Sequence, residues 1–339
     1  MAEVRFYHVT SEGGLVSHPS LEAALVALGA GGYLWLDSVD PSREQLDALV
    51  GPLGIHPLSI EDCFDDQQVP KIDLFPNNAF VLVNCYGYGE RLLATDELDF
   101  FLGKNFLVSV SGRGSTGCGF HERLDERVRQ DLDTARKGPD FLLHTILDFV
   151  VDGKFGAIEA LEDDINAAEE AMLADAPAFH LQELMHLRRA LLALRKSLYH
   201  EREVLIKICR RDCPFVSEAA IYHFRDIYDH LAKFFELVEM NRDIVTSLTE
   251  MYLSLINNQM ALVANRTNRT VRRLTLITTI FMPLTLLAGV GGMSEWSMMT
   301  GPENWRTAYP AFLGGMVVVG VISFFVLRWI ESRGSDRPE

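Results

Sequence analysis

The chain lacks the short motifs that mark common hydrolases and nucleotide-driven pumps. It contains no GxSxG, no glycine-rich loop ending in Lys-Ser and no HExxH, so the usual parts for acyl transfer, phosphate cradling and zinc-dependent hydrolysis are missing. Cysteine is scarce, with 5 among 339 residues, and we expect these thiols to be reduced. The absences argue against an enzyme and against ATP-driven transport, and they predict no organic cofactor.

Positive charge is also scarce. Lys and Arg number 31 against 47 Asp and Glu, which leaves a formal net charge of −16. Nucleic acid is therefore not an expected partner. Divalent cations are a better match for such an acidic surface, although the acidic run at residues 159–170 is more simply explained as a solvated helix face.

Long apolar runs are missing from the first 270 residues, and two of them occur near the end, at residues 274–293 and 308–327. A helix of about 20 residues is long enough to cross a hydrocarbon core of roughly 30 Å. The first ten residues, MAEVRFYHVT, do not have the apolar stretch of a signal peptide. These features predict a multi-pass protein of the cell membrane with a large part outside the bilayer.

The arginines around the two runs predict their orientation. Arg306 is the only basic residue between the runs, whereas six arginines flank their outer ends: Arg266, Arg269, Arg272, Arg273, Arg328 and Arg333. Because basic residues collect on the cytoplasmic side, we expect both termini in the cytoplasm and the short loop outside.

Polar positions recur on one face of the first run. Thr275, Thr278, Thr285 and Gly289 are spaced by three, seven and four residues, which places them on one side of a helix. Such a face is suited to a bundle interior or a hydrated pore. The alternative is that the hydroxyls bond to the carbonyl four residues earlier in the same helix, and both explanations stay open.

Two helices per chain cannot enclose a hydrated pathway, so a pore requires several copies and predicts a homo-oligomer. Extending the polar face along the helix gives a pore-lining register of Asn268, Val271, Leu274, Thr275, Thr278, Met282, Thr285 and Gly289. The loop that follows carries Glu295 and Glu303, whose charges would attract cations when repeated around one axis.

Several motifs along the chain also resemble those of one known family. The run RRLTLITTIFMPLTLLAGVGGM, followed by an acidic loop and a second apolar run, is similar to the pore region of the CorA family of divalent metal-ion transporters. Gly292, Met293 and Ser294 stand where that family has Gly-Met-Asn. Further similar segments are YLWLDSVDP at 33–41, IHPLSIEDCFDDQQVPKID at 55–73, the arginine-rich helix at 188–203 and FRDIYDH at 224–230.

The resemblance implies the fold and the transported ion. It implies an N-terminal cytoplasmic α/β domain, a long helical stalk that continues into the first of two transmembrane helices, and a funnel-shaped homopentamer that carries Mg²⁺. It also implies narrow apolar rings at Leu274 and Met282, and a regulatory metal site between subunits in which Asp226 takes part. Asp73 is our expected partner for Asp226.

Ser294 is the main departure from the family pattern. A serine hydroxyl is shorter than an asparagine amide, so a ring of serines would hold a hydrated Mg²⁺ more loosely. We expect Ser294 and Glu295 to form the outer cation site together. Two alternatives remain: transport of Zn²⁺, Co²⁺ or Ni²⁺, coupled to protons as in the ZntB branch, and a membrane-bound metal sensor that does not conduct.

The local pattern predicts five strands and then only helices. The predicted strands are 4–9, 33–36, 80–86, 98–102 and 106–111, with helices at 20–28 and 42–49. Helices follow from residue 121, with breaks near Pro139, Pro177 and Pro214 and one long helix from 217 to 293. The expected segments are an α/β domain (1–120), a helical domain (121–216), the stalk (217–273), the first span (274–293), the outer loop (294–307), the second span (308–330) and a tail (331–339).

Overall fold

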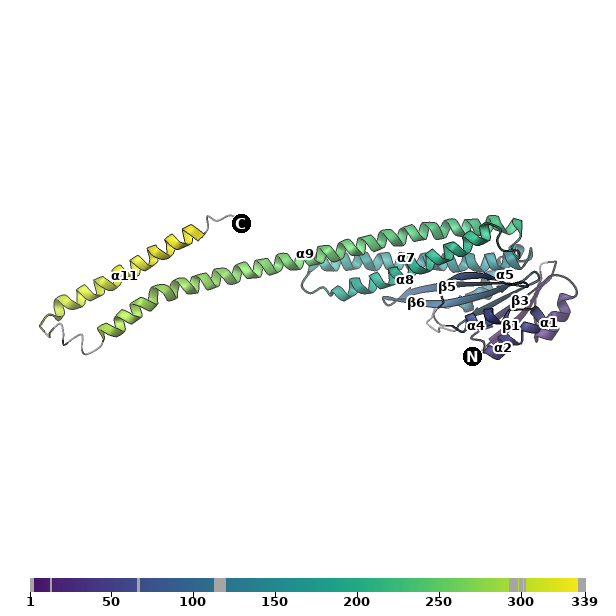
Figure 1. The fold of residues 1–339 in the computed structure, drawn as a ribbon, viewed down its shortest axis with the longest axis horizontal. Helices are drawn as coiled ribbons and strands as arrows, with labels where there is room; N and C mark the ends of the chain where they lie inside the picture. Colours follow the sequence, from purple (N-terminus) through teal and green to yellow (C-terminus); the bar gives the residue numbers. More distant parts are fainter. Residues whose placement is uncertain are drawn as a thin grey trace. The chain divides into compact units, whose positions relative to one another are not determined.

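The protein is described from a computed structural model, which describes residues 3–12, 14–65, 68–112, 120–292, 298, 301 and 303–334. The chain divides into two compact units, Met1–Leu253 and Ser254–Glu339, and the long helix α9 (Glu218–Gly291) contributes residues to both. Figure 1 shows the helices and strands of the chain in sequence colours.

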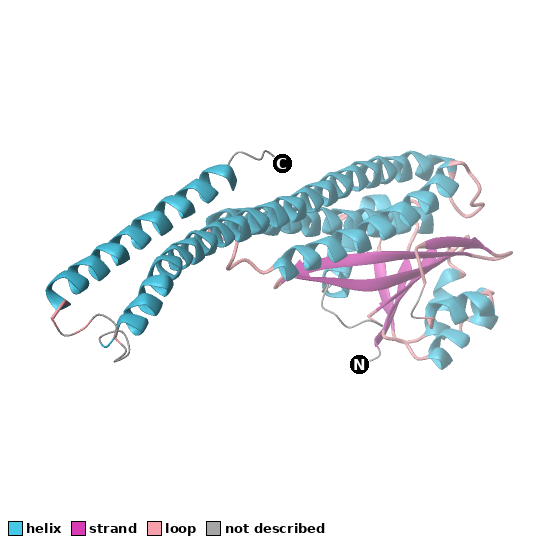
Figure 2. Ribbon diagram, turned by 60° about the vertical axis from the view of Figure 1, so that its left-hand side comes forward, coloured by secondary structure: helices cyan, strands magenta, loops and turns pink. Residues whose placement is uncertain are grey.

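The first unit is built around a seven-stranded sheet with the order β2-β1-β3-β7-β6-β5-β4. Only the central pair, β3 and β7, is parallel, and all other neighbours are antiparallel. Figure 2 shows the sheet with helices packed against it. The strands are β1 (Glu3–Val9), β2 (Leu15–His18), β3 (Tyr33–Val39), β4 (Lys71–Leu74), β5 (Ala79–Gly89), β6 (Leu92–Leu102) and β7 (Phe106–Ser111).

The central strand β3 is covered on both faces, which explains its composition. Its first six residues, YLWLDS, are all buried, as expected for a strand with helices on both sides of the sheet. Leu34 and Leu36 belong to the apolar core that the sheet shares with the N-terminal helices. Trp35 and Asp37 alternate with them and point to the opposite face, where Ser109 accepts the Trp35 indole N–H at 3.1 Å and donates to Asp37 at 2.7 Å.

Four short helices cover the first face: α1 (Leu21–Leu28), α2 (Arg43–Asp47), α3 (Val50–Leu53) and α4 (Pro57–Cys63). Ser20 and Ser42 cap α1 and α2, since each side chain accepts a backbone N–H of the first turn. Ala24, Leu46 and Ile60 from these helices are buried in the core cluster on this side of the sheet. Burial of this apolar surface is the main force that holds the helices to the sheet.

The remaining helices follow on the other side of the unit: α5 (Phe120–Gln130), the short α6 (Leu132–Ala135), and the long helices α7 (Pro139–Ala174), α8 (Leu181–Cys209) and α9. The helix α7 packs along β5 and also contacts α8. Gly138 precedes Pro139 at the start of α7, and proline is tolerated at that first position because its missing N–H would have no helical partner. The three predicted breaks near Pro139, Pro177 and Pro214 are confirmed.

The second unit consists of the C-terminal part of α9 and of α11 (Trp305–Gly334), which runs back beside it (Figure 1). Both helices are long and apolar enough to cross a membrane, with mean hydropathies of 1.9 and 2.3 in their most apolar windows. The two helices approach closely where glycine removes a side chain. A Cβ placed on Gly291 would lie 2.5 Å from the ring of Phe312, so only glycine fits there without a shift.

The predicted elements are largely confirmed, with differences at the margins. Two strands are absent from the prediction, β2 and β4, and β6 begins at Leu92 rather than at residue 98. The helical stretch from residue 121 has one additional break, between α5 and α6 at Asp131. The long helix ends at Gly291, two residues before its predicted end, and α11 extends beyond the predicted second span at both ends.

Candidate ion pathway and metal sites

The C-terminal part of α9 has two different faces. One face is partly covered, at Leu276, Ile280, Leu284, Leu287 and Gly291. These positions are spaced by three or four residues, as expected for one side of a helix. Two residues of this face, Leu284 and Gly291, lie close to Gly320 and Phe312 of α11. The opposite face is exposed along its whole length in the single chain.

Every predicted pore-lining residue lies on this exposed side of α9. The eight residues are Asn268, Val271, Leu274, Thr275, Thr278, Met282, Thr285 and Gly289, and each is exposed. A shallow groove runs between Thr278 and Val290, with Met282, Thr285 and Gly289 in its wall. The side chains of Met282 and Leu274 are 70% and 64% exposed. An apolar surface of this kind is normally covered by lipid or by another protein chain.

The threonine hydroxyls of this face bond to their own helix. Thr275, Thr278 and Thr285 each donate to the carbonyl four residues earlier, at 2.9, 2.8 and 2.8 Å. This is the arrangement that the second of the two sequence-based explanations expected. It does not remove the polar character of the face, because a hydroxyl that donates one hydrogen bond retains lone pairs that accept others.

The outer loop, residues 294–307, is described only at residues 298, 301 and 303–307. The Gly292 N–H donates to the carbonyl of Ala288 at 3.0 Å and closes the last turn of α9. Met293, Ser294 and Glu295 lie outside the described residues. Glu303 is exposed in the turn that leads into α11, where the Asn304 N–H donates to the carbonyl of Gly301 at 3.2 Å.

The predicted regulatory residues lie on separate elements of the first unit. Asp73 is on β4, where its carboxylate lies 3.2 Å from the ammonium of Lys71, and Asp62 lies 2.7 Å from the same ammonium. Burial acts against the charged form of Lys71, but its hydrogen bonds to Asp62 and Asp73 outweigh this effect and raise its pKa. Asp226 is exposed on α9.

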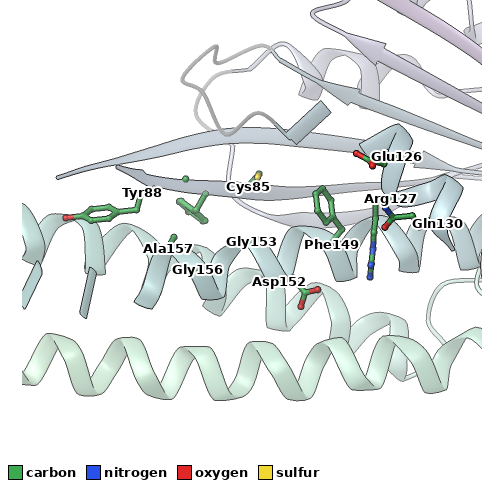
Figure 3. Close-up of a pocket in the computed structure, with 12 residues that line it drawn as sticks. Cys85, Tyr88, Glu126, Arg127, Gln130, Phe149, Asp152, Gly153, Gly156 and Ala157 are labelled. Atoms are coloured by element: carbon green, nitrogen blue, oxygen red, sulfur yellow. The ribbon is translucent and has the colours of Figure 1, made fainter. Parts of the chain in front are cut away.

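A cavity of about 640 Å³ lies in the first unit between β5, α5 and α7 (Figure 3). Gly153 and Gly156 of α7 line it, and open space lies above both. Arg127 of α5 reaches Asp148 at 3.4 Å. Burial, and then the charge of Asp148, raise the pKa of Asp152. The pair of helix-interior glycines was the only sequence signal for this cavity, since glycine destabilises a helix interior by about 1 kcal/mol relative to alanine.

Within the described part of the chain, no group of three or more His, Cys, Asp or Glu side chains is arranged so that it could hold one metal ion. Any divalent-cation site in this protein therefore uses fewer such side chains, residues outside the described ranges, or more than one subunit.

Comparison with known proteins identifies the family. The sequence matches the family described as "CorA-like Mg2+ transporter protein" over residues 30–329. The chain belongs to the CorA family. The cobalt/magnesium transport protein CorA of Thermotoga maritima is 34% identical over 304 residues, which cover 87% of this chain and 83% of that protein.

Similarity to other CorA proteins extends over the whole length. The cobalt/magnesium transport protein CorA of Methanocaldococcus jannaschii is 24% identical over 302 residues and covers 88% of this chain. The complete structure of the CorA magnesium transporter from that organism superposes with a TM-score of 0.71 at 20% identity, over 96% of both chains. The α/β unit, the long helix and the two apolar C-terminal helices thus form a CorA fold, and the chain is a membrane protein.

Proposed function

We propose that this CorA-family protein conducts divalent metal ions across the cell membrane, with Mg²⁺ as the main cargo and the membrane potential as the driving force. The observation that carries the proposal is the exposed face of α9, which combines three threonines, an asparagine and a glycine with three apolar residues in one helical register. Membership of the CorA family and the magnesium and cobalt transport named for its relatives support it.

We propose a homopentamer as the conducting form. A single chain exposes its polar α9 face on one side and packs α11 on the other, so the face can enclose water only when several copies surround one axis. In this arrangement α11 would lie outside the ring of α9 helices. Native mass spectrometry of the detergent-solubilised protein tests the number, and a mass of five chains is expected.

The arginines around the two spans support an orientation of the chain in the membrane. Six of them flank the cytoplasmic ends of the proposed spans and only Arg306 lies in the loop, so we place both termini in the cytoplasm and the loop outside. The acidic first unit would then face the cytoplasm, where ions leave the pore.

The proposed outer site consists of Gly292, Met293, Ser294 and Glu295, with Glu303 at its rim. Mg²⁺ keeps most of its water and is best held through that hydration shell by oxygen acceptors. Five serine hydroxyls supply such acceptors, and the carboxylates of Glu295 and Glu303 would raise the local concentration of cations.

We assign gating to two places in the protein, one in the pore and one on the cytoplasmic side. Leu274 and Met282 form apolar rings that can close to ions by excluding water. Asp73 of one subunit and Asp226 of its neighbour bind Mg²⁺ on the cytoplasmic side and stabilise the closed form when the internal concentration is high. Breaking the ion pair between Asp73 and Lys71 would accompany metal binding.

One alternative has a specific observation in its favour. Because Ser294 replaces the signature asparagine, the outer ring has shorter acceptors that hold a hydrated Mg²⁺ more loosely, and it would discriminate less between Mg²⁺ and transition-metal ions of similar size. Zn²⁺, Co²⁺ or Ni²⁺ transport, with or without proton coupling, is therefore the second candidate.

The outer site can be tested with three variants in proteoliposomes. Ser294→Asn should tighten selection for Mg²⁺ over Co²⁺ and Ni²⁺, whereas Ser294→Ala should weaken it. Glu295→Ala should reduce the initial uptake rate, and the reduction should shrink as salt rises because exposed charges are screened. Wild-type rates and ion preference in both alanine variants would refute the assignment.

A further inference from the structure

Two histidines from distant parts of the sequence meet where α7 packs beside α9. The ring centroids of His144 and His223 lie 5.0 Å apart, with the ring planes at 61°. Phe141 contacts His223 edge-on and Phe224 contacts His144 in the same way, at 5.5 and 5.8 Å. The aromatic contacts hold both imidazoles in place on the two helices.

The His144 ring carries a polar atom that nothing in the described structure satisfies. Its Nδ1 atom is buried and has no hydrogen-bond partner among the described residues. Buried polar atoms without partners are uncommon, and an ion or a water molecule is a frequent explanation. Burial, and then the proximity of His223, lower the pKa of His144 to about 4.

The spacing of the two rings, which is also an ordinary edge-on aromatic distance, leaves room for one metal ion between imidazole nitrogens. Zinc binds imidazole nitrogen at about 2.0–2.1 Å, which places the ring centroid about 3 Å from the metal, so two tetrahedral imidazoles have centroids about 5 Å apart. The carboxylates of Asp131 and Asp226 act electrostatically on His144, and their negative charge favours a cation at this position.

We propose that His144 and His223 bind a transition-metal ion of the Zn²⁺, Co²⁺ or Ni²⁺ type and thereby link α7 to α9. Water molecules complete the coordination, since no third His, Cys, Asp or Glu side chain of the described residues is placed to do so. Imidazole suits these ions, whereas Mg²⁺ prefers oxygen ligands and an octahedral shell. The site lies on the helix that continues into the first apolar span, and its ligands differ from those of the proposed magnesium site.

A metal that joins two helices binds only when they are packed together. Such binding stabilises the folded state, and at a free metal concentration 100 times the dissociation constant the folding equilibrium shifts about 100-fold. We expect Zn²⁺ to raise the apparent Tm of the full-length protein in detergent more than an equal concentration of Mg²⁺ does. Dialysis against chelator should reverse the difference.

Three histidine variants make the test specific. His144→Gln and His223→Gln should each lose the additional Zn²⁺ shift, because removal of a direct ligand costs at least the 10- to 100-fold in affinity that loss of an outer-shell partner costs. His230→Gln is the matched control, since His230 lies further along α9 and stacks on Phe234. It should retain the shift.

A second measurement does not depend on unfolding. After equilibrium dialysis with Zn²⁺, elemental analysis should find one more zinc per chain in the wild type and in His230→Gln than in His223→Gln. If His144→Gln does not fold, His223→Gln alone decides the question. Equal zinc content in all variants, or the same loss in His230→Gln as in His223→Gln, would overturn the proposal.

Discussion

Lys154 of α7 and Glu201 of α8 form an ion pair in the interior of the first unit. The ammonium Nζ and the carboxylate Oε1 lie 2.6 Å apart, and the two side chains are 0% and 2% exposed. The same oxygen accepts the Ser197 hydroxyl at 3.0 Å and the Asn84 N–H of β5 at 3.1 Å, and Lys154 also donates to the Asn84 carbonyl. One buried carboxylate thus joins a strand and two helices.

Removing one partner of this pair should destabilise the protein strongly. Lys154→Met leaves Glu201 charged and buried without its counterion, at an expected cost of about 3–5 kcal/mol in the free energy of unfolding. The double variant Lys154→Met/Glu201→Leu should recover most of that loss, because apolar residues of similar volume can replace a buried pair. Chemical denaturation, followed by a signal from the first unit, gives the free energy of unfolding of the wild type, the single variant and the double variant.

An exposed ion pair in the same unit is the control. Arg211 and Glu218 lie 2.8 Å apart with side chains 67% and 77% exposed. Glu218→Gln should cost less than about 1 kcal/mol. A similar cost at both positions would show that burial does not determine the contribution of Lys154 and Glu201.

Asp140 connects the beginnings of two helices and should contribute to stability. It is buried near the start of α7, and its carboxylate accepts the backbone N–H of Ser217, just before α9, at 2.9 Å and that of Phe141 at 3.0 Å. Asp140→Ala should cost about 1–3 kcal/mol, because a backbone donor at a helix start loses its charged partner. Asp133→Ala, at a mostly exposed side chain, should cost less than about 0.5 kcal/mol.

The raised pKa of Asp152 predicts a pH dependence. Its folded-state pKa lies above the ordinary value because of burial and the nearby Asp148, so the folded state binds this proton more tightly than the unfolded state. Stability from this group is therefore present below its unfolded pKa and is lost as pH rises through the folded pKa. Asp152→Asn should raise the Tm at pH 7 and have less effect near pH 3.

Asp163 on the same helix is exposed, as Asp152 is, and provides the comparison for Asp152. Asp163→Asn should leave the Tm and its pH dependence nearly unchanged. If Asp152→Asn lowers the Tm at pH 7, the assignment of a raised pKa to Asp152 is wrong.

Two adjacent threonines allow a matched test of the proposed pore face. Thr278 and Thr279 both donate to the carbonyl four residues earlier at 2.8 Å, but successive residues point about 100° apart around a helix. Thr278→Val should lower Mg²⁺ flux roughly fivefold, because a valine removes a hydrogen-bond acceptor from the hydrated ion at a cost near 1 kcal/mol. Thr279→Val should change flux little, and equal effects would reject the predicted register.

The sequence predicted the elements that have a clear internal pattern. β3, β5 and β7 contain apolar or β-branched runs, and α9 has a continuous helical period. The two strands absent from the prediction, β2 and β4, have four residues each, lie at the two edges of the sheet and are at most partly apolar. Their position depends on pairing with β1 and β5, which a local pattern does not reveal.

Some of the functional residues could likewise be predicted from the sequence, and others could not. The pore-lining register could be proposed from spacing, because all of its members lie on one helix. The proximity of His144 to His223 and of Lys154 to Glu201 could not, because each pair joins helices that are separate in the sequence and meet only after packing. No local pattern distinguishes these residues from other histidines and charges on α7, α8 and α9.

Ion flux into proteoliposomes made with the purified full-length protein tests the central claim most directly. Mg²⁺, Zn²⁺, Co²⁺ and Ni²⁺ should be compared with and without an imposed membrane potential and pH gradient. We predict Mg²⁺ uptake that increases with an inside-negative potential and does not depend on the pH gradient. Zn²⁺ preference with dependence on the proton gradient, or no flux of any of the four ions, would contradict the account.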